Sequence, residues 1–173
     1  MLFTNLETER LLLDNINSSD RDFIFSQFSD DVVTKYLYDE EPFTDISEAD
    51  NLIDFYITPE PRQWHRWVIR RKTDNANIGT CGFHCWDTKN NRVDVGYDMK
   101  KEFWGNGYMT EAMNKIIEFA RLNMNIKEIV ARIYIDNEKS IKLAQRLGFK
   151  VSGSYNETFR GKEYPHSIYS LYL

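Results

Sequence analysis

The fold of this chain is decided by the stretch Phe103-Trp104-Gly105-Asn106-Gly107-Tyr108-Met109-Thr110-Glu111-Ala112. Residues 92–99 before it alternate in the manner of a β-strand, and the residues after it carry apolar side chains at the spacing of an α-helix. Gly105 and Gly107 permit backbone angles and close approaches that a side chain would block. The stretch therefore predicts a strand, a two-glycine turn and the start of a helix.

Such a connection can hold a phosphate group. Backbone amides in the first turn of a helix have no partner within it, and the helix macrodipole adds partial positive charge there. The alternative is that the two glycines only make a tight turn. Two other glycine motifs are excluded, because no Gly-Lys-Ser/Thr follows and Thr110 stands where a dinucleotide-binding motif needs its third glycine.

The full stretch, with Gly96-Tyr97 before it, resembles the acyl-CoA loop of the GNAT N-acetyltransferases. Within that superfamily it is similar to the branch that acetylates ribosomal proteins at an N-terminal alanine or serine. Residues 6–13 resemble the first strand of this branch. Asn137-Glu138-Lys139-Ser140, followed by Leu147-Gly148-Phe149, resembles its second cofactor helix and the strand after it. The resemblance spans nearly the whole chain and implies a single GNAT-like domain.

Length and composition favour one folded domain over residues 1–173. The chain is long enough to bury a single core, and 42% of its residues are hydrophobic and 14% aromatic, as in globular proteins. Its net charge of −5 argues against a nucleic-acid partner, because such binding relies on positive charge. The same charge suits a cationic amine or a basic peptide as substrate.

The expected location is the cytoplasm, with no membrane partner. The N-terminus shows no basic-then-apolar signal pattern, and no apolar run is long enough to cross a bilayer. Cys81 and Cys85 are predicted on one face of a strand, roughly 13 Å apart, which is too far for a disulfide. Because no histidine cluster accompanies them, we expect no metal site, and free thiols fit a reducing compartment.

Alternation, helical spacing and turn residues predict an α/β fold. The expectation is a mixed, mostly antiparallel sheet of six to seven strands, flanked by about four helices. The predicted strands are 10–13, 64–71, 77–86, 93–99, 128–134, 149–155 and 167–173. The predicted helices begin near Ser18, Thr44, Tyr108 and Asn137, and residues 30–43 are expected to be irregular.

The resemblance implies acetyl-CoA as cosubstrate. In the family, the strand before the glycine loop pairs through its backbone with the pantetheine arm, and a nearby amide polarises the thioester carbonyl. Because Glu102 is acidic, we expect backbone amides rather than this side chain to hold the pyrophosphate. The implied cofactor-binding residues are Tyr97, Asp98, Met99, Trp104, Gly105, Asn106, Gly107, Tyr108, Met109, Thr110, Asn137 and Ser140. For Asn137, a simple helix cap is the alternative.

The departing thiolate needs a proton, and the resemblance implies that Ser140 supplies it. Many superfamily members carry a tyrosine seven residues after the asparagine that starts the second cofactor helix, but here that position is Ala144. The ribosomal-protein branch has a serine three residues after the asparagine, which here is Ser140. The alternative is that its hydroxyl only bonds the backbone of its own helix.

The acceptor ammonium must lose a proton before it attacks, and two residues are candidate bases. Asp94 lies two residues before Gly96, where the branch often has an acid, and burial could raise the pKa of its carboxyl toward the working pH. His84 is the rival, because imidazole titrates near neutrality. A solvated sheet position for Asp94 and a structural role for His84 remain the alternatives.

Acceptor selection is expected where aromatic and acidic residues gather, since together they can hold an ammonium group. The candidates are Tyr36, Tyr38, Asp39, Glu40, Trp64, Trp86 and the turn Arg160-Gly161-Lys162. Packing in the core is the alternative for the aromatic residues. Three functions stay open: acetylation of a protein N-terminus, acetylation of a small amine such as a polyamine or aminoglycoside, and a non-catalytic acyl-CoA-binding module. Monomer and homodimer are both left open.

Overall fold

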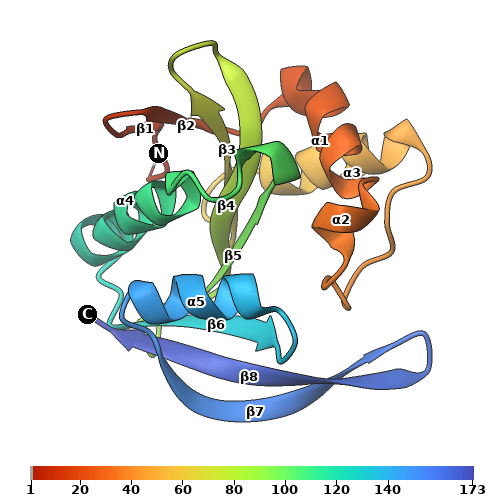
Figure 1. Cartoon of the computed structure of the whole chain (residues 1–173). Helices are drawn as coiled ribbons and strands as arrows, with labels where there is room; N and C mark the ends of the chain where they lie inside the picture. Colours follow the sequence, from red (N-terminus) through yellow and green to blue (C-terminus); the bar gives the residue numbers. More distant parts are fainter. Residues whose placement is uncertain (1) are drawn as a thin grey trace.

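Within residues 2–173, which the computed structural model describes, an eight-stranded sheet forms the centre of the molecule (Figure 1). Its strand order is β1-β2-β3-β4-β5-β6-β8-β7. Neighbouring strands are antiparallel except β5 and β6, which run parallel. The strands are β1 Leu6–Glu7, β2 Leu11–Asn15, β3 His65–Arg71, β4 Ala76–Asp87, β5 Arg92–Met99, β6 Glu128–Tyr134, β7 Lys150–Phe159 and β8 Lys162–Tyr172.

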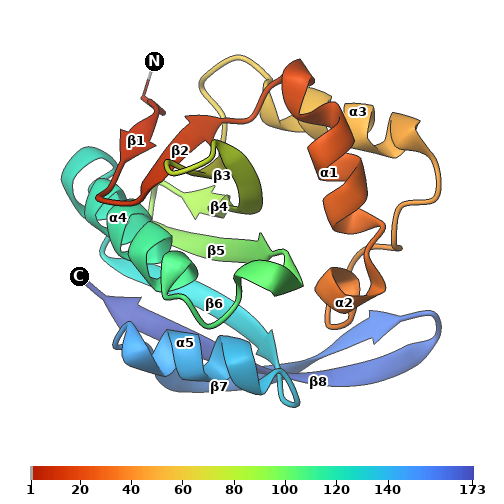
Figure 2. The ribbon, with the colours of Figure 1, turned by 45° about the horizontal axis from the view of Figure 1, so that its top comes forward.

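The described residues also form five α-helices, which cover both faces of the sheet. Figure 2 shows α1, α2 and α3 grouped on one side of the sheet and α4 and α5 on the other. The helices are α1 Arg21–Phe28, α2 Asp31–Thr34, α3 Ile46–Tyr56, α4 Tyr108–Asn123 and α5 Glu138–Arg146. We call the two sides of the sheet the α1/α3 face and the α4/α5 face.

Local sequence explains where the helices begin. The side chains of Asp45 and Glu48 form a capping box at the start of α3. Asn137 caps α5 by accepting a hydrogen bond from the Ser140 amide at 3.3 Å. Helix α4 differs, because its N-cap is Gly107, with φ +77°, and no side chain caps it. The amides at the start of α4 are therefore left for another partner.

Two apolar clusters hold the layers together, one on each face. The α4/α5 face buries Trp67 and Phe83 from the sheet against Met113 and Ile116 from α4. The α1/α3 face buries Val68 against residues that include Ile24, Phe28, Ala49 and Ile53. Burying a large apolar side chain contributes roughly 1.5–3 kcal/mol, so these clusters fix both helix layers on the sheet.

The parallel strands β5 and β6 pair only at their N-terminal ends. The register joins residues 92–94 to residues 128–130 and then stops, although β5 continues to Met99 and β6 to Tyr134. The sheet is therefore split at the carboxyl ends of these two strands. Helices α4 and α5 follow β5 and β6 in the chain, so both of their N-termini lie at the split (Figure 2).

The predicted α/β fold with a mixed, mostly antiparallel sheet is confirmed. The sequence prediction missed two short elements, the two-residue strand β1 and the four-residue helix α2 within residues 30–43. Neither is long enough to show a periodic pattern. The last two strands are also longer than predicted and form a hairpin from Lys150 to Tyr172.

The prediction that Cys81 and Cys85 share one face is wrong. Cys81 is buried, whereas Cys85 is exposed, and both are free thiols. The register between β4 and β5 shifts after His84, and Cys85 has a left-handed backbone with φ +50°. A bulge of this kind rotates the strand, so the simple alternation of faces ends at His84.

Candidate active site

An open cleft of about 890 Å³ lies at the split between β5 and β6. Its walls come from the end of β5, the glycine loop with the first turn of α4, the first turns of α5, and residues 32–37. It brings together all the predicted cofactor-binding residues except Asn106: Tyr97, Asp98, Met99, Trp104, Gly105, Gly107, Tyr108, Met109, Thr110, Asn137 and Ser140. The side chain of Asn106 instead donates to the Phe103 and Trp104 carbonyls at 3.2 and 3.1 Å.

The floor of the cleft is the uncapped start of α4. The Glu111 amide bonds back to the Gly107 carbonyl at 3.0 Å, so the three amides of residues 108–110 have no partner within the helix. Gly105, with φ +79°, and Gly107 hold the left-handed backbone that turns the chain toward these amides. The macrodipole of a helix this long adds positive potential at the same point. This geometry suits an anionic group.

A clamp that the sequence reasoning missed holds the glycine loop in place. Arg10 donates to the Glu111 carboxylate through Nε at 2.6 Å and to the Asn106 carbonyl through Nη1 at 3.0 Å. Thr8 donates to the other oxygen of Glu111 at 2.6 Å. Burial alone would raise the pKa of Glu111, but the hydrogen bonds from Thr8 and Arg10 outweigh it and lower that pKa. Nothing local in the sequence points to contacts that join positions 101 residues apart.

Cations from α5 face the start of α4 across the cleft. Lys139, Lys142 and Arg146 lie on one face of α5 and all line the cleft. The Lys139 ammonium lies 3.6 Å from the centre of the Trp104 ring, and Arg146 Nη1 lies 3.4 Å from the Thr110 hydroxyl. Positively charged side chains therefore lie opposite the backbone amides at this site.

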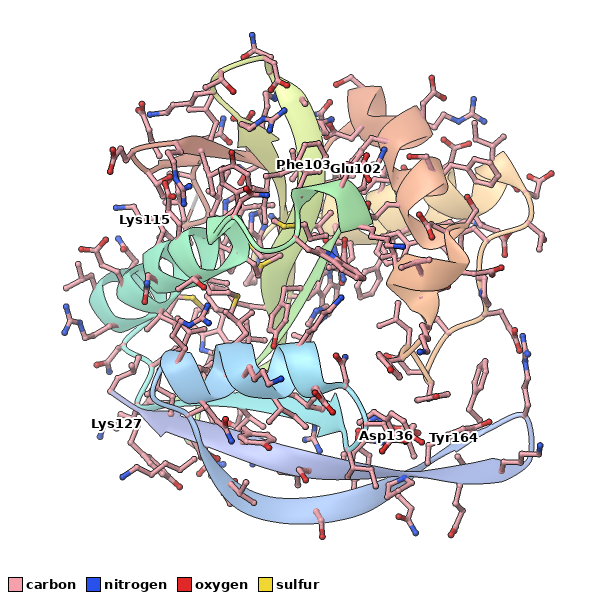
Figure 3. All side chains as sticks on the ribbon, viewed as in Figure 1. Glu102, Phe103, Lys115, Lys127, Asp136 and Tyr164 are labelled. Atoms are coloured by element: carbon pink, nitrogen blue, oxygen red, sulfur yellow. The ribbon has the colours of Figure 1, made fainter. Side chains whose placement is uncertain are left out.

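The acidic residue Glu102 does not line the cleft. It lies in the 3₁₀ turn Lys101–Phe103 and is exposed, next to Phe103 (Figure 3). Its negative charge therefore repels an anion bound in the cleft less strongly than the sequence suggested.

Ser140 lies in the first turn of α5 and faces the cleft. Its amide is held by Asn137, but its hydroxyl has no hydrogen-bond partner among residues 2–173. Its carbonyl lies 3.5 Å from the hydroxyl of Tyr97, whose pKa is raised to about 12 by burial. Ala144, where the resemblance noted above places a tyrosine in many superfamily members, is buried and packs in the core. A free hydroxyl is thus available to the cleft at this position of α5.

The two candidate bases lie outside this cleft, on the α1/α3 face. Asp94 and His84 are cross-strand neighbours on β5 and β4. Oδ2 of Asp94 accepts a hydrogen bond from Nε of Arg132 at 2.7 Å, whereas Oδ1 has no hydrogen-bond partner among the described residues. Burial alone would lower the pKa of Arg132, but the hydrogen bond and the charge of Asp94 raise it.

The structure weakens the argument for His84 as a base. Burial, together with the nearby charge of Arg66, lowers the pKa of His84 to about 3. The imidazole is therefore neutral at physiological pH and takes up a proton poorly. His65 is fully buried and stacks on Phe3 at 4.3 Å, and His166 bonds the Tyr164 carbonyl, so both have structural roles.

A buried polar network lies behind β5 on the α1/α3 face. Arg66 donates to Asp98 at 3.0 Å, to the Thr80 hydroxyl at 2.6 Å and to the Tyr56 hydroxyl at 3.2 Å. Gln27 donates to the other oxygen of Asp98 at 2.6 Å. These contacts hold the Asp98 side chain away from the α4/α5 face, so only its backbone is available to a cofactor. The sequence pattern gave no indication of this network.

The expected acceptor residues divide into two groups. Tyr38 stacks on Tyr164 with ring centres 3.8 Å apart, and Tyr36 packs on Tyr134 at the end of β6. Figure 3 shows Asp136 and Tyr164 at this end of the molecule. Arg160 forms an ion pair with Glu41, which ties the 35–43 segment to the β7–β8 hairpin. The other two aromatic candidates, Trp64 and Trp86, pack against the apolar clusters instead.

Two absences within residues 2–173 concern metal binding and the membrane. No group of three His, Cys, Asp or Glu side chains is placed to hold a metal ion. None of the helices in this part of the chain has the length and apolar character needed to cross a membrane.

Known proteins are similar to this chain in sequence and in fold. The family model described as acetyltransferase (GNAT) domain matches residues 10–150. The uncharacterised N-acetyltransferase YoaA of Bacillus subtilis is 33% identical over 98% of this chain and 97% of its own length. Two solved structures, each 18% identical, superpose with a TM-score of 0.84. One is spermidine N-acetyltransferase from Vibrio cholerae in complex with CoA and spermine, which covers 95% of this chain and 96% of that chain. The other is RimL, a ribosomal L7/L12 alpha-N-protein acetyltransferase in complex with coenzyme A, which covers 96% of each chain.

Proposed function

The chain belongs to the GNAT acetyltransferase family, and on that premise we propose that it acetylates the N-terminal amino group of a protein, with acetyl-CoA as the acetyl donor. The observation that carries the proposal is the cleft at the split sheet, where the uncapped start of α4 meets the free edge of β5. Among the structural neighbours, RimL acts on a ribosomal protein, and the Vibrio cholerae enzyme is a spermidine acetyltransferase. A small amine is therefore the second candidate acceptor.

Two parts of the cleft suit the phosphates and the pantetheine arm of acetyl-CoA. The amides of residues 108–110, with Lys139, Lys142 and Arg146 opposite, would hold its phosphates. The edge of β5 beyond Asp94 has no strand partner on the β6 side, so its backbone groups would pair with the pantetheine arm as an added strand would. Acetyl-CoA would supply the activated acetyl group as its thioester.

The acceptor would approach from the α1/α3 face, where Asp94 lies at the end of the β5–β6 pairing. Oδ1 of Asp94 is available to receive a proton from the ammonium, directly or through a water molecule, while Arg132 holds the other oxygen. On the α4/α5 face, the free hydroxyl of Ser140 would protonate the departing thiolate. Acid and base thus lie on opposite faces of the split.

Thiol release from acetyl-CoA in the presence of an amine panel tests the proposal. The panel contains peptides with free N-termini, the same peptides with blocked N-termini, polyamines and aminoglycosides. We expect release with the free N-termini and none with the blocked ones. Coenzyme binding without turnover of any amine would instead favour an acyl-CoA-binding module, and turnover of polyamines alone would favour the second acceptor.

A further inference from the structure

The ring of His84 is held in one tautomer by a chain of buried donors. Arg66, which can only donate, gives a hydrogen bond to the Tyr56 oxygen at 3.2 Å. Tyr56 Oη lies 3.2 Å from Nδ1 of His84, and its O–H has no other acceptor among residues 2–173. A buried O–H without an acceptor is costly, so Tyr56 donates to Nδ1. Nδ1 is then the acceptor of the ring, and Nε2 carries the proton.

The Nε2–H group points over Gly96 and is unpaired. A Cβ added at Gly96 would lie 2.9 Å from Nε2 of His84, so the missing side chain is what makes room for the ring. Among the described residues, Nε2 has no hydrogen-bond partner, although Nδ1 has one. Gly96 follows the last residues of β5 that pair with β6. The N–H therefore lies at the point where the sheet opens, on the face opposite α4 and α5.

A carboxylate lies beside this donor. Asp94 is the cross-strand partner of His84, and its Oδ1 is unpaired within residues 2–173. Cross-strand partners have Cβ atoms roughly 4.5–5.5 Å apart, so an N–H donor and a charged acceptor leave the sheet from adjacent positions at its opening. An ammonium group suits Asp94 and is unsuited to His84, because two donors cannot bond each other.

Resting on the proposed acetyltransferase function, we propose that His84 is a specificity-determining residue that donates through Nε2–H to an oxygen beside the acceptor amine, while Asp94 receives the ammonium. The acceptor class is then an amine with a carbonyl or hydroxyl oxygen on the neighbouring carbon, as in the first residue of a peptide. Polyamines carry no such oxygen and leave the His84 donor without a partner. A site that hydrogen-bonds its substrate discriminates against ligands that lack the matching acceptor, because the donor is then left unpaired.

The test compares matched acceptors. Alaninamide carries the oxygen, and 3-methylbutan-2-amine, in which an isopropyl group replaces the carboxamide, is an alkyl analogue of similar shape without it, so the ratio of their kcat/KM values reports the contact. We expect wild-type protein to favour alaninamide by at least about tenfold, the factor expected for one lost hydrogen bond. His84→Leu should reduce this ratio toward one. His84→Gln, which places an amide N–H near the position of Nε2, should restore much of it.

An unchanged ratio in His84→Leu would overturn the proposal, as would a wild-type preference for spermidine over alaninamide. Because the leucine variant could fold poorly, nitrogen-15 NMR of the wild-type imidazole gives a second test. A neutral ring protonated at Nε2 from pH 5 to pH 8 supports the assignment, and an Nδ1–H tautomer or a ring that titrates in this range refutes it. Turnover of amines without the oxygen preference refutes the His84 role alone, whereas no turnover of any amine refutes the acetyltransferase function itself.

Discussion

The Ser140 side chain carries the proposed last step, protonation of the thiolate. Ser140→Ala should lower kcat by roughly a hundredfold, the low end for loss of a general acid, while the CoA dissociation constant stays nearly unchanged. Steady-state kinetics and calorimetry measure the two quantities. Ser26→Ala is the matched control, because this exposed helical serine bonds only the Phe23 carbonyl at 3.1 Å. Equal kcat values for the wild type and Ser140→Ala would remove Ser140 from the mechanism.

The Glu111 side chain makes a contribution to the free energy of unfolding that depends on pH. Its pKa is lowered in the folded protein, so its stabilising effect is complete above the unfolded pKa of about 4.3 and is lost as the pH falls through the folded value. Glu111→Gln should therefore destabilise the protein at pH 7, and the difference from wild type should shrink as the pH falls toward 3. Denaturant unfolding at several pH values measures this.

Glu118→Gln is the control for that experiment. Glu118 is an exposed residue of the same helix, and its pKa is lowered by the hydrogen bond to Lys115. Because exposed pairs contribute little, Glu118→Gln should change the free energy of unfolding only slightly at any pH. A Glu111→Gln effect that is equally small at pH 7 would mean that the clamp on the glycine loop does not stabilise the fold.

At the scale of elements, the start of α4 depends on the left-handed backbone of Gly107. Gly107→Ala should cost about 1–2 kcal/mol of stability, because φ is +77° and an L-residue is strained there. Gly161, in the β7–β8 turn, has φ +72° and open space where a Cβ would be added. Gly161→Ala should therefore reduce stability by about the same amount. Only the Gly107 variant should also weaken CoA binding. Equal CoA affinity in both variants would argue against a phosphate site at this helix start.

Helix α5 should contribute charge to the same site. Arg146→Gln should weaken CoA binding roughly threefold to tenfold and make it less sensitive to salt, because a partly screened contact to phosphate is lost. Lys115→Gln, on the exposed side of α4, should leave the affinity unchanged (Figure 3). Calorimetry in low and high salt measures the CoA affinity of both variants. A CoA affinity of Arg146→Gln equal to that of the wild type at low salt would exclude a role for this cation.

The elements themselves show what a sequence can predict. The glycine loop, the helix spacing after it and the Asn137 cap are local patterns, so the long elements were predictable, and so were the parts of the cleft at the end of β5 and the starts of α4 and α5. The short helix α2 and the turn of β4 at Cys85 were not, because four residues show no period and a bulge breaks the alternation.

The same limit applies to the site. The pairing of Arg10 with Glu111 and the chain from Arg66 to His84 join residues far apart in sequence. The sequence offered His84 as a candidate base because free imidazole titrates near neutrality, but burial beside Arg66 lowers its pKa to about 3. Such shifts depend on tertiary surroundings, which no local pattern encodes.

At the scale of the whole molecule, the split sheet would separate the route of the acetyl donor from the route of the acceptor amine. The cleft between α4 and α5 would receive the acetyl donor, and the α1/α3 face would receive the amine, with the two meeting where β5 leaves β6. A crystal structure with CoA tests this arrangement most directly. The expected result is the pyrophosphate within hydrogen-bond distance of the amides of residues 108–110, with the pantetheine arm along β5 beyond Asp94. CoA bound anywhere else on the molecule, with this cleft left empty, would contradict it.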